Sequence, residues 1–229
     1  MTVKAQKPST LLWFRQDLRL ADNPALQAAI GRGTPVIPVF IWAPDEEGAW
    51  PPGAASKWWL HQSLAALAGD LHRLGARLIL RQGPTLETLR RLLTQTGANA
   101  VFWNRRYEPA IYQRDTRFQE ALRAGGIQAE SFNAALLHEP WTIQNKSGKP
   151  FQVFTPFWKH CLSLSEPRTP LPPPAQLPSP RKWPDSLDLA ALKLEPVPDW
   201  AGGLRTTWQP GVAGATAQLD RFLATAFAA

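Results

Sequence analysis

Residues 11–26 read LLWFRQDLRLADNPAL, and this run joins an apolar strand, a charged turn and the start of a helix. Asn23 is a residue type that caps helix N-termini, and Pro24 suits the first helical position. The strand therefore passes almost directly into a helix, as strands do in open α/β sheets. Ligands of such sheets sit beside these turns, outside the carboxyl ends of the strands.

The same alternation of strand and helix continues to residue 133. Nearly continuous apolar runs, such as the one at Pro35–Trp42, predict strands buried on both faces. Leucines at spacings of three and four residues predict an amphipathic helix over Ala54–Leu74. The predicted strands are Thr10–Arg15, Pro35–Trp42, Arg77–Leu80, Asn99–Trp103 and Ile127–Phe132, and the predicted helices are Asn23–Arg32, Ala54–Leu74, Pro84–Thr96 and Gln113–Ala124.

Strands separated by single helices imply right-handed crossovers, a parallel sheet and helices on both of its faces. We therefore predict a doubly wound, Rossmann-like α/β fold with a five-stranded parallel sheet in the order 3-2-1-4-5. In that order the winding reverses between the first and fourth strands, which places Arg15–Asp17 and Asn104–Glu108 at the ligand-binding edge. No G-x-G-x-x-G run is present, so we do not predict a nicotinamide dinucleotide.

The pattern changes beyond this unit. A short aromatic segment, Phe151–Leu164, predicts one helix that starts near Pro156. Glu166–Trp200 is rich in proline and lacks helical periodicity, which predicts an extended linker across the domain surface. Gly211–Ala228 regains helical character. We predict an α/β domain at 1–135, a proline-rich linker at 136–205 and, at 206–229, a terminal helix that begins a second domain.

Composition limits the classes of function. The chain has 229 residues, a formal net charge of +7 and one cysteine, Cys161. One cysteine excludes an intrachain disulfide and suits a reducing compartment. Met1–Thr10 lacks the apolar core of a signal peptide and no later run is long enough to span a membrane, so we expect a soluble, cytoplasmic protein with no membrane contact. The positive charge fits a nucleic-acid partner or merely solvated helix faces.

Six motifs, in order along the chain, resemble the N-terminal part of DNA photolyases and cryptochromes. The resemblance covers roughly residues 10–225. The residues of these motifs look more like those of plant cryptochromes and their bacterial photolyase relatives than like those of the enteric type. The motifs are WFRQDLRLADNPAL at Trp13–Leu26, VFIWAPDEEG at Val39–Gly48, SKWWL at Ser56–Leu60, WNRRYEP at Trp103–Pro109, GKPFQVFTPFW at Gly148–Trp158 and WQPG at Trp208–Gly211.

The resemblance implies the N-terminal domain of a deoxyribodipyrimidine photolyase, which uses light to repair pyrimidine dimers in UV-damaged DNA. In that family a reduced FAD in a helical domain transfers an electron to a lesion flipped out of the duplex. The N-terminal α/β domain holds a light-harvesting antenna chromophore, methenyltetrahydrofolate in many members and a deazaflavin in others. The family's flavin and lesion sites lie downstream of residue 229, so we expect no FAD site and no repair by this chain alone.

The resemblance and the predicted sheet edge single out Glu108, Asn104, Trp50 and Arg15 as candidate cofactor-binding residues. Glu108 matches a carboxylate that hydrogen-bonds the pterin in folate-binding members, or it pairs with a neighbouring arginine. Asn104 can bond a ligand carbonyl or cap its own turn. Trp50 can stack on a flat ring or pack within its loop. For Arg15, a buried ion pair with an aspartate that shapes the turn is the simpler interpretation.

No catalytic residue is predicted, and the histidines and Cys161 lack the spacing of a metal site. Two other functions stay open. A cryptochrome-type blue-light photoreceptor would share this domain, and only the flavin-binding half would distinguish it from a repair enzyme. A stand-alone binding module without a chromophore would keep only a protein interface and would lack near-ultraviolet absorbance.

Overall fold

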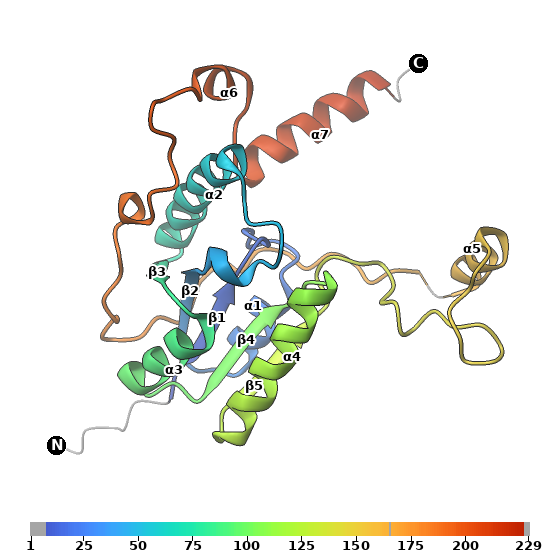
Figure 1. Ribbon diagram of the computed structural model, residues 1–229, viewed down its shortest axis with the longest axis horizontal. Helices are drawn as coiled ribbons and strands as arrows, with labels where there is room; N and C mark the ends of the chain where they lie inside the picture. Colours follow the sequence, from blue (N-terminus) through green and yellow to red (C-terminus); the bar gives the residue numbers. More distant parts are fainter. Residues whose placement is uncertain (1–7, 165, 227–229) are drawn as a thin grey trace.

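The computed structural model describes residues 8–164 and 166–226, and a five-stranded sheet lies at its centre (Figure 1). Neighbouring strands are parallel, and their order is β3-β2-β1-β4-β5. The predicted doubly wound α/β fold and its strand order are therefore confirmed. The strands are β1 (Thr10–Phe14), β2 (Val36–Trp42), β3 (Ile79–Gln82), β4 (Ala100–Asn104) and β5 (Gln128–Phe132).

Four helices connect these strands, and they cover both faces of the sheet. They are α1 (Pro24–Gly31), α2 (Ala54–Arg73), α3 (Thr85–Thr96) and α4 (Pro109–Ala124). Successive residues of a strand point to opposite faces. Leu12 and Phe14 therefore pack under α1 and α2, whereas Trp13 and Val39 pack under α3 and α4. This winding brings the carboxyl ends of the strands to one edge, which is the edge predicted for the candidate site residues.

Local sequence explains where several helices begin and end. The side-chain oxygen of Asn23 accepts a backbone N–H three residues further on, and Pro24 opens α1. Gly97 ends α3 at a φ of +62°, a left-handed conformation that glycine adopts without steric cost. Helix α4 begins at Pro109, earlier than the predicted start at Gln113, because proline is well suited to the first helical position.

The proline-rich segment is extended, as predicted, but it also contributes to the core of the α/β domain. Leu177 and Leu192 are each 3% exposed and belong to the apolar cluster beneath α1 and α2. The Leu80 N–H of edge strand β3 donates to Ser186 Oγ at 2.9 Å, and the Leu80 carbonyl accepts the Leu187 N–H at 3.0 Å. The segment therefore satisfies backbone groups that an edge strand would otherwise leave open.

The remaining helices are α5 (Phe154–Ser163), α6 (Gly202–Thr207) and α7 (Val212–Ala226), and Figure 1 shows α5 and α7 projecting away from the sheet. Helices α5 and α7 confirm the two predicted outer helices, although the expected end of the second at Ala228 lies outside the described residues. The short elements α6, η1 (Pro44–Glu46) and η2 (Leu189–Leu192) are not predicted by the sequence pattern, because such short helices carry little periodic signal.

None of the described helices combines the length and the apolar character that crossing a bilayer requires.

Candidate functional site

A cavity of about 360 Å³ lies at the carboxyl ends of β1 and β4, where the winding of the sheet reverses. Its volume is in the range of small-molecule binding sites, which start at roughly 300 Å³. Its walls come from the turn after β1, from the residues that follow β4 and from the chain after β5. The polar side chains in its lining include Asp17, Asn104, Arg106, Tyr107 and Glu108.

Glu108 stands at the rim of this cavity with 53% of its side chain exposed. Arg106 Nη2 donates to Glu108 Oε1 at 2.8 Å, and Arg106 Nη1 donates to Glu47 Oε2 at 2.7 Å. The hydrogen bond from Arg106 lowers the pKa of Glu108, so the carboxylate is ionised at neutral pH. The pairing with a neighbouring arginine is thus present, and it leaves the carboxylate accessible from the cavity.

Arg106 lies between the two carboxylates and holds the outer wall of the cavity. Burial alone would lower the pKa of Arg106, but hydrogen bonds with Glu108 and Glu47 outweigh it and raise the pKa. A guanidinium held between two carboxylates has little freedom to rotate. Arg106 therefore presents Glu108 in a defined orientation.

The side chain of Asn104 is buried and fully engaged within the protein. Its amide nitrogen donates to Asp17 Oδ2 at 2.5 Å and to Asn23 Oδ1 at 2.8 Å, and its oxygen accepts the Ala25 N–H at 3.1 Å. These bonds tie the end of β4 to the turn after β1 and to the first turn of α1. Asn104 lines the cavity, but its two donors and its carbonyl oxygen already have partners.

Arg15 forms the expected buried ion pair, but its partner lies 100 residues away in the sequence. Its guanidinium donates to Asp115 of α4 and to the Asn104 carbonyl oxygen, while its backbone N–H donates to Asp17 Oδ1 at 2.9 Å. Burial lowers the pKa of Arg15, and the charge of Asp115 opposes that shift. Arg15 lines a smaller hollow of about 70 Å³ on the other side of Arg106.

Trp50 is not brought to the cavity. It is 90% exposed in the loop before α2, and it lines neither the main cavity nor the smaller hollow. Of the four candidates, Glu108 and Asn104 come together at the main cavity and Arg15 lies behind them. In the part of the chain that the structure describes, no group of three or more His, Cys, Asp or Glu side chains is arranged to hold a metal ion.

Sequence reasoning missed several residues that shape the cavity. The Tyr107 hydroxyl donates to Glu139 Oε1 at 2.7 Å, and burial together with this bond raises the pKa of Tyr107 to about 12. Arg105 also pairs with Glu139. Arg19 Nη2 donates to the Ala134 carbonyl at 2.6 Å, which fixes the wall formed after β5. These partners lie far apart in sequence, so no local motif indicates that they pair.

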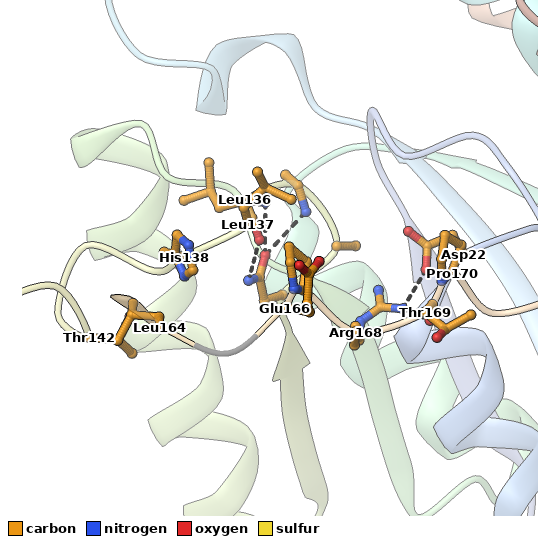
Figure 2. A pocket seen from close by; sticks show the side chains of 14 residues that line it. Asp22, Leu136, Leu137, His138, Thr142, Leu164, Glu166, Arg168, Thr169 and Pro170 are labelled. Carbon is orange, nitrogen blue, oxygen red and sulfur yellow. Dashed lines mark hydrogen bonds and ion pairs between the residues drawn. The ribbon is translucent and has the colours of Figure 1, made fainter. Parts of the chain in front are cut away.

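A second hollow is larger, at about 940 Å³, and Figure 2 shows the side chains that line it. It runs between the loop after β5, with Leu136 and His138, and the start of the proline-rich segment. Arg168 donates to Asp22 Oδ1 at 2.5 Å at one side of it. Ala134 and Ala135 line both hollows, so the two are neighbours on one surface. The cavity of about 360 Å³ lies at the strand ends and contains the ionised Glu108 carboxylate, which makes it the better candidate for specific binding.

A doubly wound α/β domain with a ligand-sized cavity at its winding reversal belongs to the open-sheet class, whose ligands bind at this edge. Within that class the sequence is specific. Residues 10–177 match the family model for DNA photolyase. The chain belongs to the DNA photolyase family.

Individual relatives agree with this assignment. The chain is 47% identical to a deoxyribodipyrimidine photo-lyase of Agrobacterium fabrum over 93% of its length, and 45% identical to cryptochrome-1 of Arabidopsis thaliana over 73%. It superposes on a bacterial class III photolyase from Agrobacterium tumefaciens with a TM-score of 0.88 at 44% identity, covering 97% of this chain. The chain spans only 44%, 25% and 46% of these three proteins.

Proposed function

We propose that this chain holds a light-harvesting chromophore in the cavity between the ends of β1 and β4. In a longer deoxyribodipyrimidine photolyase, the excitation energy would pass to an FAD that drives repair of pyrimidine dimers in UV-damaged DNA. The observation that carries the proposal is the ionised, half-exposed Glu108 at the rim of a ligand-sized cavity. Family membership supports the same assignment.

Methenyltetrahydrofolate is the chromophore that the residues fit best, with a deazaflavin as the alternative. A pterin ring presents amino and ring N–H donors on one edge, and a carboxylate accepts them in charge-assisted hydrogen bonds. Glu108 supplies such a carboxylate, and Arg106 holds it in place. The small side chains of Ala134 and Ala135 leave room towards the neighbouring hollow, where the tail of a folate can lie. When bound, the chromophore supplies near-ultraviolet absorption.

Two of the other candidates act around the ring. Asn104 and Arg15 are positioning residues, because their polar groups bind the protein itself and hold the two strand ends in register. Trp50 lies outside the cavity and is 90% exposed, so we assign it no contact with the ring. No step of bond-making chemistry is assigned to these residues.

We propose the domain boundaries 1–135 for the antenna domain, 136–205 for the linker and 206–229 for the first helix of a helical flavin-binding domain. Leu219 and Leu223 of α7 are about half exposed, at 55% and 48%, as expected for a helix that packs on a further domain. A cytoplasmic location is part of the proposal, supported by the single cysteine.

A cryptochrome-type photoreceptor is the second candidate, because identity to cryptochrome-1 of Arabidopsis, 45%, nearly equals that to the Agrobacterium photolyase, 47%. The antenna cavity would serve both functions. Light-dependent loss of pyrimidine dimers from DNA, measured with the longer protein, would favour repair. Photoreduction of FAD without loss of dimers would favour a photoreceptor.

The antenna role is tested by titrating the purified chain with methenyltetrahydrofolate and recording near-ultraviolet absorption and fluorescence. We expect saturable uptake by the unaltered chain. Glu108→Ala should weaken uptake roughly tenfold to a hundredfold, because a hydrogen bond to a charged group contributes about 1.5–3 kcal/mol. Glu87→Ala, on the exposed side of α3, is the matched control and should bind normally. No uptake by the unaltered chain, or equal uptake by both variants, would contradict the proposal.

A further inference from the structure

Helix α2 carries two stripes of contact residues. Leu64 and Leu71 lie on its inner face and belong to the apolar core. Trp59, Gln62 and Ala66 follow one another at intervals of three and four residues, so they share another face of the same helix, which we call the outer stripe. Figure 1 shows that α7 begins beside α2 and points away from the sheet. The outer stripe contacts the chain that leads into α7.

The first contact of the outer stripe joins two aromatic rings. Trp208, which lies just before α7, packs edge-on against Trp59, with ring centroids 6.1 Å apart and planes at 79°. Trp59 in turn packs edge-on against the buried Trp58, also with centroids 6.1 Å apart. Aromatic rings favour this edge-to-face geometry. The three indoles therefore form a continuous row from the interior of the α/β domain to the segment before α7.

The second contact is a close approach between α2 and the residue that precedes α7. Gly211 has a φ of +96°, and a Cβ atom at this position would lie 2.9 Å from the Ala66 Cβ. Both the conformation and the lack of space call for glycine. Ala66 is also small, so the backbone that enters α7 can lie directly against α2.

A third set of interactions attaches the chain further upstream. Gln62 Nε2 donates to Glu195 Oε1 at 3.4 Å, and His61 Nε2 lies 3.7 Å from Glu195 Oε2. Arg205 Nη2, from α6, lies 3.8 Å from Glu195 Oε1. Because these distances are long, the interactions are weaker than the two contacts above. They nevertheless connect the loop that contains α6 to the same helix.

We propose that the outer stripe of α2 fixes the direction in which α7 leaves the α/β domain, and with it the placement of the helical domain that α7 begins. The inference rests on the proposed domain boundaries and adds the contact that orients one domain against the other. Trp59 and Ala66 are positioning residues, since neither lines the antenna cavity. Transfer of excitation energy depends on the distance and the relative orientation of the donor and the acceptor. A fixed attachment at α2 would therefore set its efficiency in the longer protein.

Spin labels on the chain itself test this attachment. Cys161→Ser removes the only cysteine. Arg90→Cys on α3 and Gln218→Cys on α7 then introduce labelling sites at exposed positions. Double electron–electron resonance measures the distance between the two labels. We expect one narrow distance distribution, because the contacts with α2 hold α7 in a single orientation.

Two contact variants each remove one attachment. Trp208→Ala removes the ring contact with Trp59. Ala66→Leu fills the space beside Gly211 and keeps a strong helix former in α2. Each should replace the narrow distance by a broad distribution, while the far-ultraviolet circular dichroism and the midpoint of urea unfolding stay unchanged. Trp208→Phe keeps an aromatic ring at this position and should retain the narrow distance.

Matched controls change residues of the same type outside these contacts. Trp200→Ala removes an indole that is 48% exposed, against 51% for Trp208. Ala65→Leu enlarges an exposed alanine next to Ala66. Both controls should keep the narrow distance.

Three results would overturn the proposal. They are a broad distribution in the labelled chain without further changes, a narrow one that survives in either contact variant, and broadening in either control. None of the substituted residues lines the antenna cavity. A failure to take up methenyltetrahydrofolate would therefore count against the proposed function alone, and a failure of the distance measurement against the attachment alone.

Discussion

Asn104 and Glu108 lie close together at the end of β4, yet the structure gives them different tasks. Asn104 is still within the strand, so it is only 3% exposed and is surrounded by Asp17, Asn23 and Ala25, which use its polar groups. Glu108 follows the strand, where the chain has turned outward, and more than half of its side chain faces solvent or the cavity. Asn104 therefore supports the cavity from within, and we propose that Glu108, accessible beside Arg106, contacts the ligand.

Replacing Asn104 tests this division of tasks. Asn104→Ala should destabilise the fold by about 2 kcal/mol or more, because it removes three hydrogen bonds in a buried place and leaves the Ala25 N–H without its acceptor. The measurement is urea unfolding followed by circular dichroism. Asn99→Ala removes one exposed hydrogen bond with Arg32 and should change stability by about 0.5 kcal/mol or less. Equal effects of both substitutions would show that the Asn104 network does not hold the strand ends.

Tyr107 gives a prediction on pH. Its pKa is raised to about 12 by burial and by the hydrogen bond to Glu139, above the ordinary value of about 10. The folded state thus favours the protonated form; its stabilising contribution is full below about pH 10 and is lost as the pH rises towards 12. The free energy of unfolding of Tyr107→Phe should not show this decrease between about pH 10 and pH 12.

Tyrosinate absorbance measures the effect directly, because the chain has two tyrosines, Tyr107 and Tyr112. The difference between the titration of the unaltered chain and that of Tyr107→Phe should show one group ionising near pH 12. A midpoint near the ordinary value of about 10 in that difference would show that the bond to Glu139 is absent.

Among the elements, those with a strong periodic or apolar pattern could be predicted from sequence. The buried run of β2 and the leucine stripe of α2 are examples, and the predicted bounds of both agree with the observed ones to within a residue or two. Sequence also located the cavity, because the predicted order 3-2-1-4-5 places the winding reversal between the first and fourth strands. It did not reveal that Leu177 and Leu192 enter the core, since isolated leucines between prolines carry no periodicity.

The site was less predictable than the fold for a physical reason. Glu108 could be found because its motif is local, but its partner Arg106 also holds Glu47, which lies in a different loop. Arg15 was expected to pair within its own turn and pairs with Asp115 of α4 instead. Trp50 lies in a loop whose path no pattern specifies. Contacts between loops depend on tertiary packing. Periodic patterns in a single sequence predict helices and strands but not such contacts.

The proline-rich segment offers a test at the scale of elements. Leu192→Ala should cost about 2–4 kcal/mol of stability, because it leaves a cavity beneath α2. The measurement is again urea unfolding. Leu187→Ala, from the same segment, truncates a leucine that is 37% exposed and should cost less than about 1 kcal/mol. If the two variants unfolded alike, the segment would be a linker on the surface and not part of the core.

At the scale of the whole molecule, the cavity and the projecting helices lie in different parts of the structure. The cavity lies entirely on the α/β domain and is bounded by the ends of its two central strands, whereas α5 and α7 extend away from it (Figure 1). The relatives are more than twice as long as this chain, and we propose that the outward helices contact a further domain. The residues that line the cavity all lie outside these helices, so we propose that this chain alone binds a chromophore.

A crystal structure of the chain grown with methenyltetrahydrofolate tests the account most directly. We predict density for a pterin ring in the cavity between the ends of β1 and β4, with its donor edge within hydrogen-bond distance of the Glu108 carboxylate. A pterin bound elsewhere, with Glu108 paired only to Arg106 beside an empty cavity, would contradict it.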